Sequence, residues 1–186
     1  MVMIAYCIFY GKKYPYSNVV HLQREFKKHN ILLKCDHIKD FTIIKEHWHK
    51  IKYFNNAQED TIIIDIDQRV VGDISDMINY PVEDNELITY KGWSDGCPIN
   101  GGWYKFKSGS LQYVWDKFNS DIDKWQNYYF KERIVHYQYY GEQNFVYDTV
   151  IENGGKVTTM PSKWASKYDM DEFNGAKIIH SAGVKK

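Results

Sequence analysis

Two aspartates, Asp65 and Asp67, follow an apolar run and are separated by one residue. The run, residues 61–64, is short and β-branched, which is typical of a strand buried on both faces of a parallel sheet. Ligands of open α/β sheets bind beyond the carboxyl ends of such strands. Two neighbouring carboxylates repel each other unless a cation or a shared proton relieves them. We therefore expect Asp65 and Asp67 to hold a divalent metal beside a phosphate-bearing substrate. The alternative is a strand end with two solvated acids.

The segments before this pair predict a doubly wound parallel sheet. Buried strands are expected at residues 2–9 and 31–35 in addition to the run described above. Helical spacing of apolar residues predicts helices from Ser17 or Asn18 to about residue 29, and over residues 43–54. The order strand, helix, strand, helix, strand is typical of a doubly wound sheet.

Later segments predict further strands at residues 87–90, 99–106, 157–160 and 177–179, and helices at residues 111–118, 122–130 and 142–152. Ser108 is a candidate cap for the first of these helices. Gly101-Gly102 lies inside a predicted strand and suggests close approach by a ligand or by backbone. No repeat or linker interrupts the chain, so residues 1–186 are expected to form a single α/β domain.

The charge balance argues against a nucleic-acid partner. Lys and Arg together number 24, as do Asp and Glu, whereas binding to a polyanion needs clustered and uncompensated cations. Aromatic residues are plentiful, with 16 Tyr, 9 Phe and 6 Trp. Tyr and Trp suit sites that stack on bases or sugar rings, although most of these residues are expected to fill the core.

The cysteines and the first residues bear on the compartment. Cys7, Cys35 and Cys97 show no CxxC spacing and indicate free thiols of a reducing compartment. Residues 1–10 are apolar but too short to span a membrane, and they lack the basic leader of a signal peptide. We expect a cytoplasmic protein without a transmembrane segment.

Several segments, taken in chain order, resemble glycosyltransferases of the GT-A fold. The resemblance is to the glycogenin and galactosyltransferase-like enzymes (family 8) that carry an Asp-x-Asp metal motif, with compact viral or phage-type members. It rests on residues 48–52, residues 62–67, Ile99-Asn100-Gly101-Gly102, Gly141-Glu142-Gln143-Asn144 and His180-x-x-Gly183-x-x-Lys186. The chain differs from that family in having Glu142 and Asn144 where Asp is usual, and in lacking Pro-Trp after the last Lys.

The resemblance implies a mostly parallel GT-A sheet flanked by helices, and metal-dependent transfer of a sugar with retention of the anomeric configuration. The donor would be a nucleoside diphosphate sugar, UDP-linked, and the acceptor a glycan or another hydroxyl group. Asp65, Asp67 and His180 would bind the metal. Carboxylates with one imidazole suit Mn²⁺, and Mg²⁺ is the other candidate. A divalent ion stabilises the charge that develops on a diphosphate leaving group.

The resemblance also implies which residues contact the substrates. Gln143 would offer its amide oxygen to the anomeric centre, and Glu142 would hold sugar hydroxyls. Asp95 is a candidate catalytic base, and Trp93 and Trp103 would flank the acceptor with it. The residues expected to bind the donor are Phe9, Tyr10, Asp36, Lys50, Ile66, Asn100, Gly183 and Lys186.

Three other functions remain open from the sequence. A dehalogenase-type phosphatase would use Asp65 as nucleophile and Asp67 as acid, but that family usually has the motif on its first strand. A nucleotidyltransferase shares the sheet and the acid pair, but usually has a longer Gly-rich basic loop than Gly11-Lys12-Lys13 after the first strand. A non-catalytic carbohydrate-binding protein would need neither metal nor nucleotide. The metal hypothesis makes a spatial prediction: His180 should lie within metal-sharing distance of Asp67.

Overall fold

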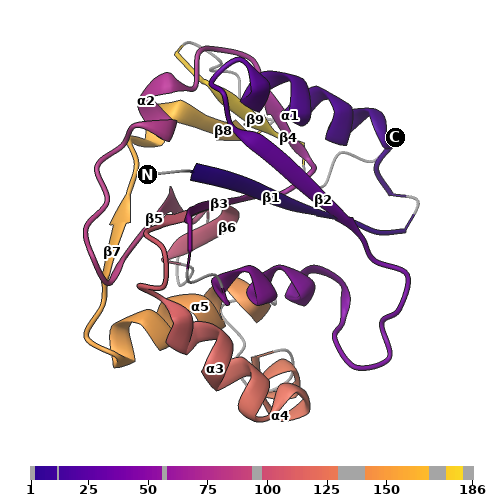
Figure 1. Cartoon of the computed structure of the whole chain (residues 1–186), viewed down its shortest axis with the longest axis vertical. Coiled ribbons are helices and arrows are strands. Elements are labelled where there is room, and N and C mark those ends of the chain that lie inside the picture. Colours follow the sequence, from indigo (N-terminus) through magenta and orange to yellow (C-terminus); the bar gives the residue numbers. More distant parts are fainter. Residues whose placement is uncertain are drawn as a thin grey trace.

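A six-stranded sheet forms the centre of the computed structural model, which describes residues 3–11, 13–55, 58–93, 98–129, 141–167 and 175–181. The strand order is β2-β1-β3-β6-β5-β7 (Figure 1). The strands are β1 (Met3–Phe9), β2 (Leu32–His37), β3 (Asp60–Ile64), β5 (Glu86–Lys91), β6 (Ile99–Phe106) and β7 (Lys156–Thr159). The three strands predicted before the acid pair are confirmed, and they lie side by side.

The sheet is mostly parallel, with one reversed strand. β1 is parallel to both β2 and β3, and β5 is parallel to β7, whereas β6 is antiparallel to β3 and β5. The predicted doubly wound sheet is therefore mixed, and not wholly parallel. Because β6 is reversed, its first residues lie at the carboxyl end of β3, where Ile64 pairs with Trp103.

A second, smaller sheet lies beyond the acid pair. Its strand order is β4-β9-β8, with β4 (Gln68–Val70), β9 (Ile178–His180) and β8 (Ala165–Lys167). β4 begins directly after Asp67, and it pairs antiparallel with β9, so that Gln68 is the register partner of His180. The backbone N–H of Ser181 donates to the carbonyl of Asp67 at 2.9 Å. This small sheet brings the last described residues to the acid pair.

Helices cover both faces of the central sheet (Figure 1). They are α1 (Ser17–Lys27), α2 (Ser75–Ile78), α3 (Gln112–Ser120), α4 (Ile122–Asn127), α5 (Gly141–Glu152) and the 3₁₀ helices η1 (Glu46–Phe54) and η3 (Ser162–Trp164). α1 and α2 pack on one face, and η1, α3 and α5 on the other. In the part of the chain described here, no helix is long and apolar enough to cross a membrane.

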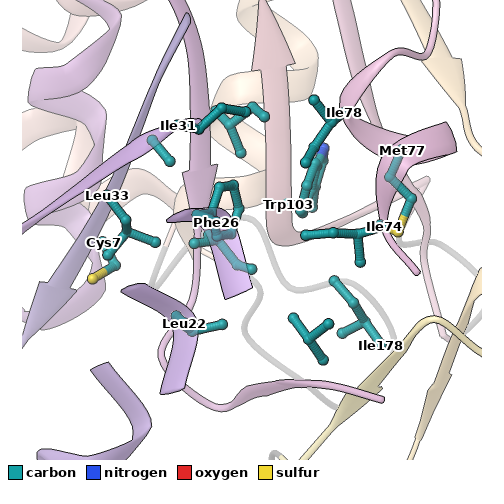
Figure 2. Close-up of a cluster of buried hydrophobic side chains, with 14 of the residues drawn as sticks. Cys7, Leu22, Phe26, Ile31, Leu33, Ile74, Met77, Ile78, Trp103 and Ile178 are labelled. Carbon is teal, nitrogen blue, oxygen red and sulfur yellow. The ribbon is translucent and has the colours of Figure 1, made fainter. Parts of the chain in front are cut away.

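The two faces have separate apolar cores. Figure 2 shows the first, in which Phe26 of α1 faces Trp103 of β6 and Leu22 of α1 belongs to the same cluster. The rings of Phe26 and Trp103 stack with centroids 6.0 Å apart. Trp103 is fully buried, so the prediction that it flanks an acceptor is wrong. Its large apolar surface instead fixes β6 against α1, in line with the strong drive to bury aromatic rings.

Three helix starts differ from the prediction. The segment expected to be a helix from residue 43 is a 3₁₀ helix that begins at Glu46. α1 has no side-chain cap, because its cap position is Tyr16 and not Ser17 or Asn18; the Asn18 amide nitrogen donates to the carbonyl of Ile66 at 3.0 Å. Ser108 caps nothing either, since α3 begins four residues later, after Leu111. Tertiary contacts override local capping preferences at these positions.

Candidate active site

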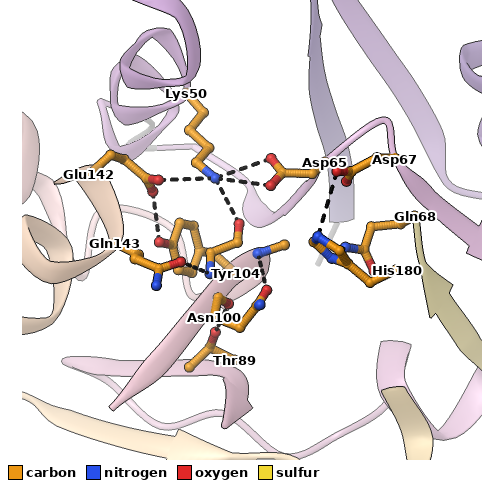
Figure 3. Close-up of polar contacts among 12 residues, drawn as sticks. Lys50, Asp65, Asp67, Gln68, Thr89, Asn100, Tyr104, Glu142, Gln143 and His180 are labelled. Carbon is orange, nitrogen blue, oxygen red and sulfur yellow. Dashed lines mark hydrogen bonds and ion pairs between the residues drawn. The ribbon is translucent and has the colours of Figure 1, made fainter. Parts of the chain in front are cut away.

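The candidate active site lies where β3 ends and β6 begins. The N–H of Asp65 donates to the carbonyl of Gly102 at 3.1 Å, and the N–H of Gln68 donates to the carbonyl of Asp65 at 3.1 Å. This turn directs the two acids to different partners. Asp65 faces Lys50, and Asp67 faces His180, as Figure 3 shows. The strand end therefore carries two polar clusters.

The first cluster is an ionic group around Lys50. Its ammonium lies 3.1 Å from Asp65 Oδ1 and 3.1 Å from Glu142 Oε2, and donates to the carbonyl of Gly101 at 2.8 Å. The Tyr104 hydroxyl donates to Glu142 Oε1 at 2.7 Å. Side-chain exposure is 2% for Lys50 and 3% for Glu142 but 27% for Asp65. Of the three charged groups, only the Asp65 carboxylate therefore reaches solvent appreciably.

Burial and charge act against each other in this cluster. Burial opposes the charged form of Lys50, but Asp65 and Glu142 together raise the pKa of its ammonium. Burial also raises the pKa of Glu142 to about 7, although Lys50 acts in the opposite direction. The buried Lys50 ammonium thus pairs with two carboxylates, and Glu142, the more deeply buried of the two, has a raised affinity for a proton.

A bulge on β6 makes room for this arrangement. β5 pairs Thr89 with Tyr104 but the next residue, Tyr90, with Asn100, so residues 101–103 have no partner on β5. A Cβ on Gly101 would lie 2.8 Å from the Tyr104 hydroxyl and 3.0 Å from Lys50 Nζ. The sequence predicted close approach to the two glycines by a ligand or by backbone; the groups that approach them are instead side chains of the chain itself. Bulges beside functional sites commonly redirect side chains in this way.

The side chains of Gln143 and Asn100 accept hydrogen bonds from two backbone N–H groups of the bulge. The amide oxygen of Gln143 accepts the N–H of Gly101 at 2.9 Å. Asn100 Oδ1 accepts the N–H of Gly102 at 2.8 Å, and the Asn100 carbonyl accepts the Thr89 hydroxyl at 2.9 Å. The structure therefore brings Lys50, Asn100, Glu142 and Gln143 to the acid pair, as expected for neighbours in one site.

The second cluster surrounds Asp67. The Tyr14 hydroxyl donates to Asp67 Oδ2 at 3.1 Å, and His180 Nε2 lies 3.5 Å from the same oxygen. Asp67 Oδ1 is buried without a hydrogen-bond partner among the described residues. Burial raises the pKa of Asp67, His180 opposes the rise, and Asp65 adds to it. The predicted proximity of His180 to Asp67 is confirmed.

The chemistry of this second cluster fits a divalent cation. A buried carboxylate oxygen without a donor is costly, and a cation would satisfy it and relieve the repulsion between the two acids. Asp67 offers oxygen and His180 offers an imidazole nitrogen, which are ligands for Mn²⁺ or Mg²⁺. Within the described ranges, no group of three His, Cys, Asp or Glu side chains is arranged to hold a metal. Asp65, the third expected ligand, is turned to Lys50.

A cavity of about 120 Å³ opens next to both acids. Its lining includes the expected donor-binding residues Tyr10 and Ile66, together with Ile8, Lys13, Tyr14, His47, Asp65 and Asp67. Burial lowers the pKa of His47 to about 4, so its imidazole is neutral at physiological pH. The cavity therefore combines one cation and one neutral imidazole with the acid pair.

Four of the expected donor-binding residues are not part of this cavity lining: Lys50 and Asn100, which belong to the ionic cluster and the bulge, and Phe9 and Asp36. Phe9 packs against Tyr16 and His37, with ring centroids 5.4 and 5.3 Å away. Asp36 forms an ion pair with Lys52 at 2.6 Å and accepts the Tyr53 hydroxyl at 2.9 Å. The predicted Asp95, Gly183 and Lys186 lie outside the described residues, so their roles stay predictions.

Sequence reasoning missed six residues of the site. They are Ile8, Lys13, Tyr14, His47, Gln68 and Tyr104. His47 is three positions before Lys50, and that spacing could have placed both on one side of a helix. Lys13 and Tyr14 follow the first strand, where a ligand-binding loop is expected. Gln68 carried no signal, because its part in the site depends on the pairing of β4 with β9.

Several solved glycosyltransferase structures are similar in fold to this chain. A glycosyltransferase involved in glycosylation of the major capsid of PBCV-1 matches with a TM-score of 0.66 and 13% identity over 100% of this chain and 95% of that one. The galactosyltransferase LgtC matches with a TM-score of 0.61 and 12% identity, over 98% and 88%. GlyE of Streptococcus pneumoniae matches with a TM-score of 0.57 and 8% identity, over 89% and 47%.

Sequence comparisons add nothing to these structural matches. No protein-family model matches the chain, and no curated protein matches it. This chain's mostly parallel central sheet, flanked by helices, aligns over nearly the whole length of the PBCV-1 enzyme and of LgtC. The chain accordingly has the GT-A fold of these glycosyltransferases.

Proposed function

We propose that this protein is a metal-dependent glycosyltransferase that moves a sugar from a UDP-linked donor to a hydroxyl acceptor such as a glycan. The observation that carries the proposal is the buried Asp67 carboxylate, which has an unpartnered oxygen and faces both His180 and a cavity. The fold supports the same conclusion, because the LgtC structure that shares it contains donor and acceptor sugar analogues.

In this proposal Asp67 and His180, with Asp65, hold Mn²⁺ or Mg²⁺. The metal, when bound, supplies Lewis-acid stabilisation of the diphosphate leaving group. Lys13 at the cavity adds a further positive charge for the phosphates. Gly183 and Lys186 are proposed to meet the same diphosphate. Tyr14 keeps the Asp67 carboxylate oriented through its 3.1 Å hydrogen bond.

The nucleoside is proposed to lie against Tyr10, with Phe9 and Asp36 nearby. Tyr10 lines the cavity beside both acids, so its ring is placed for stacking on a base. Asp36 is 44% exposed at its side chain despite its ion pair with Lys52, and retains oxygen lone pairs for a base or ribose hydroxyl.

The transferred sugar is proposed to lie between the two clusters. The Gln143 amide oxygen is held in place by the Gly101 N–H, and its second lone pair can face a positively charged anomeric carbon. Glu142 and Asn100 are proposed to bind sugar hydroxyls. Lys50 acts on the sugar through the two carboxylates that it orients. Retention of the anomeric configuration and Asp95 as base belong to the same proposal.

The phosphatase alternative is less well supported. A nucleophilic Asp65 would need a free carboxylate, whereas both of its oxygens lie within 3.3 Å of Lys50 Nζ. The solved structures that share this fold at TM-scores of 0.57 to 0.66 are glycosyltransferases, which also disfavours a nucleotidyltransferase.

Calorimetry with UDP, with and without Mn²⁺, tests the proposal. We expect metal-dependent binding of UDP by the wild type and at least a tenfold loss in Asp67→Asn, which keeps the shape of the side chain but removes its charge. The matched control is Asp84→Asn, because that carboxylate is 88% exposed and remote from the site in its ion pair with Lys107. UDP binding that is equal without metal, or absent with it, would overturn the proposal. A panel of UDP-sugars assayed for slow hydrolysis then identifies the donor.

A further inference from the structure

Gln68 touches the side of the His180 ring that faces away from Asp67. The two residues are register partners in the small sheet, and as whole residues they are 2% and 7% exposed. The Gln68 amide nitrogen is in hydrogen-bond contact with His180 Nδ1, while Nε2 of the same ring faces Asp67 (Figure 3). His180 is therefore held between an amide and a carboxylate.

The amide can meet the imidazole in two ways. It can donate through its nitrogen, which places the His180 proton on Nε2, toward Asp67. It can also accept through its oxygen, which places the proton on Nδ1 and leaves a lone pair on Nε2. In the first arrangement Gln68 Oε1 is buried and has no hydrogen-bond partner among the described residues. Rotation of the amide by half a turn gives that oxygen a donor.

We propose that Gln68 is a positioning residue that prepares His180 for metal binding. Its amide oxygen accepts the Nδ1–H of His180, and the Nε2 lone pair then faces a cation shared with Asp67. This inference rests on the metal site of the proposed function. Histidines that bind metals nearly always donate their other ring N–H to an oxygen, and loss of that partner commonly costs 10- to 100-fold in metal affinity.

The packing around Gln68 supports a fixed position. A Cβ on Gly102 would overlap the Gln68 amide and would lie 2.9 Å from Asn100 Oδ1. The absence of a side chain at residue 102 is therefore what admits the amide. On the other side, the Trp93 ring lies 6.3 Å from the His180 ring, centroid to centroid. The backbone bond from Ser181 to Asp67 fixes the distance between the two strands.

Titration of Mn²⁺, followed by loss of the electron paramagnetic resonance signal of the free ion, tests this role directly. Gln68→Met keeps the length of the side chain but cannot accept the ring proton, so we expect Mn²⁺ affinity to fall about 10-fold or more. Gln68→Glu restores an acceptor, and should bind Mn²⁺ at least as tightly as the wild type. In a His180→Ala background, Gln68→Met should change the affinity less than about twofold, because the residue through which Gln68 acts is missing.

A second readout reports the proton itself. With Mg²⁺ bound, ¹⁵N NMR should place the His180 proton on Nδ1 in the wild type and in Gln68→Glu. An Nε2 proton in the Mg²⁺ complex, or a loss from Gln68→Met that is equally large in the His180→Ala background, would overturn the inference. The inference would also be overturned if Gln68→Met left the Mn²⁺ affinity unchanged while His180→Ala weakened it. The proposed metal site would then be supported, but Gln68 would have no part in it. A wild type that binds no Mn²⁺ would overturn both proposals.

Discussion

Lys50 carries the only positive charge among the described residues that contacts both Asp65 and Glu142. The cluster contains one cation and two carboxylates, and Glu142 is the more buried of the two carboxylates. Its hydrogen bond from Tyr104 and its ion pair with Lys50 stabilise the carboxylate, while burial disfavours it. The balance between these effects makes Glu142 sensitive to pH near neutrality.

A measurable consequence is a pH-dependent difference in stability between wild type and Glu142→Gln. The pKa of Glu142 is raised from 4.5 to about 7, so the folded state binds this proton more tightly than the unfolded state. The corresponding stability is fully present below about pH 4.5 and is lost as pH rises through about 7. The wild type should therefore lose about 3 kcal/mol relative to Glu142→Gln across this window. Urea unfolding of both proteins from pH 4.5 to 8.5 measures it, and parallel curves would contradict the expectation.

At the scale of elements, one hydrogen bond joins the first helix to the loop of the acid pair. Asn18, in the first turn of α1, donates to the carbonyl of Ile66 at 3.0 Å. That carbonyl lies between Asp65 and Asp67. The position of the acid pair therefore depends on a helix on the opposite side of the loop, and not only on β3.

Removal of this hydrogen bond should affect both stability and the site. We expect Asn18→Ala to lower the free energy of unfolding by about 1 kcal/mol, and to weaken metal-dependent UDP binding, because the loop between the acids loses its anchor. Ser17→Ala is the matched control, since residue 17 is exposed and its side chain makes no cap. Chemical denaturation and calorimetry measure the two effects. If the two variants had the same stability and the same UDP affinity, the hydrogen bond from Asn18 to Ile66 would not be what positions the loop.

The sequence predicts where the strands of this fold lie better than whether they run parallel or antiparallel to their neighbours. Strands such as β1 and β3 are recoverable because their apolar runs are continuous. The reversal of β6 is not, since all eight of its residues are buried and a uniformly buried strand has no directional pattern. β4 has three residues, too few for any periodicity. Residue patterns alone therefore predicted the part of the site that follows β3. His180, which β4 pairing with β9 brings to Asp67, was predicted only through the family resemblance, and Gln68 was not predicted.

At the scale of the whole molecule, the proposed binding of a metal at the unpartnered oxygen of Asp67 would stabilise the fold. A ligand that binds only the folded state stabilises it, by about 2.7 kcal/mol at one hundred times the dissociation constant. For a chain of 186 residues this corresponds to roughly 5–10 °C in Tm. We expect Mn²⁺ to raise the Tm of the wild type by this amount and to leave that of Asp67→Asn unchanged. Scanning calorimetry at fixed protein concentration measures the shift. A metal-independent Tm for the wild type would contradict the expectation.

The same experiment compares the two proteins without metal. Asp67→Asn removes a buried charge next to a second acid, so its Tm without Mn²⁺ should equal or exceed that of the wild type. A much lower Tm for the variant would mean that other groups of the chain already stabilise the Asp67 charge without a metal.

The bulge on β6 gives the site a modular construction. Gly101 borders Lys50, Tyr104 and Glu142, whereas Gly102 borders Gln68 and Asn100. Two adjacent residues of one strand thus face two different environments, which in the proposed function bind the sugar and the metal respectively. Under the proposed function, variation can therefore reach each environment separately: a change among the side chains beside residue 101 would alter which sugar is accepted and leave the proposed cation site beside residue 102 as it is.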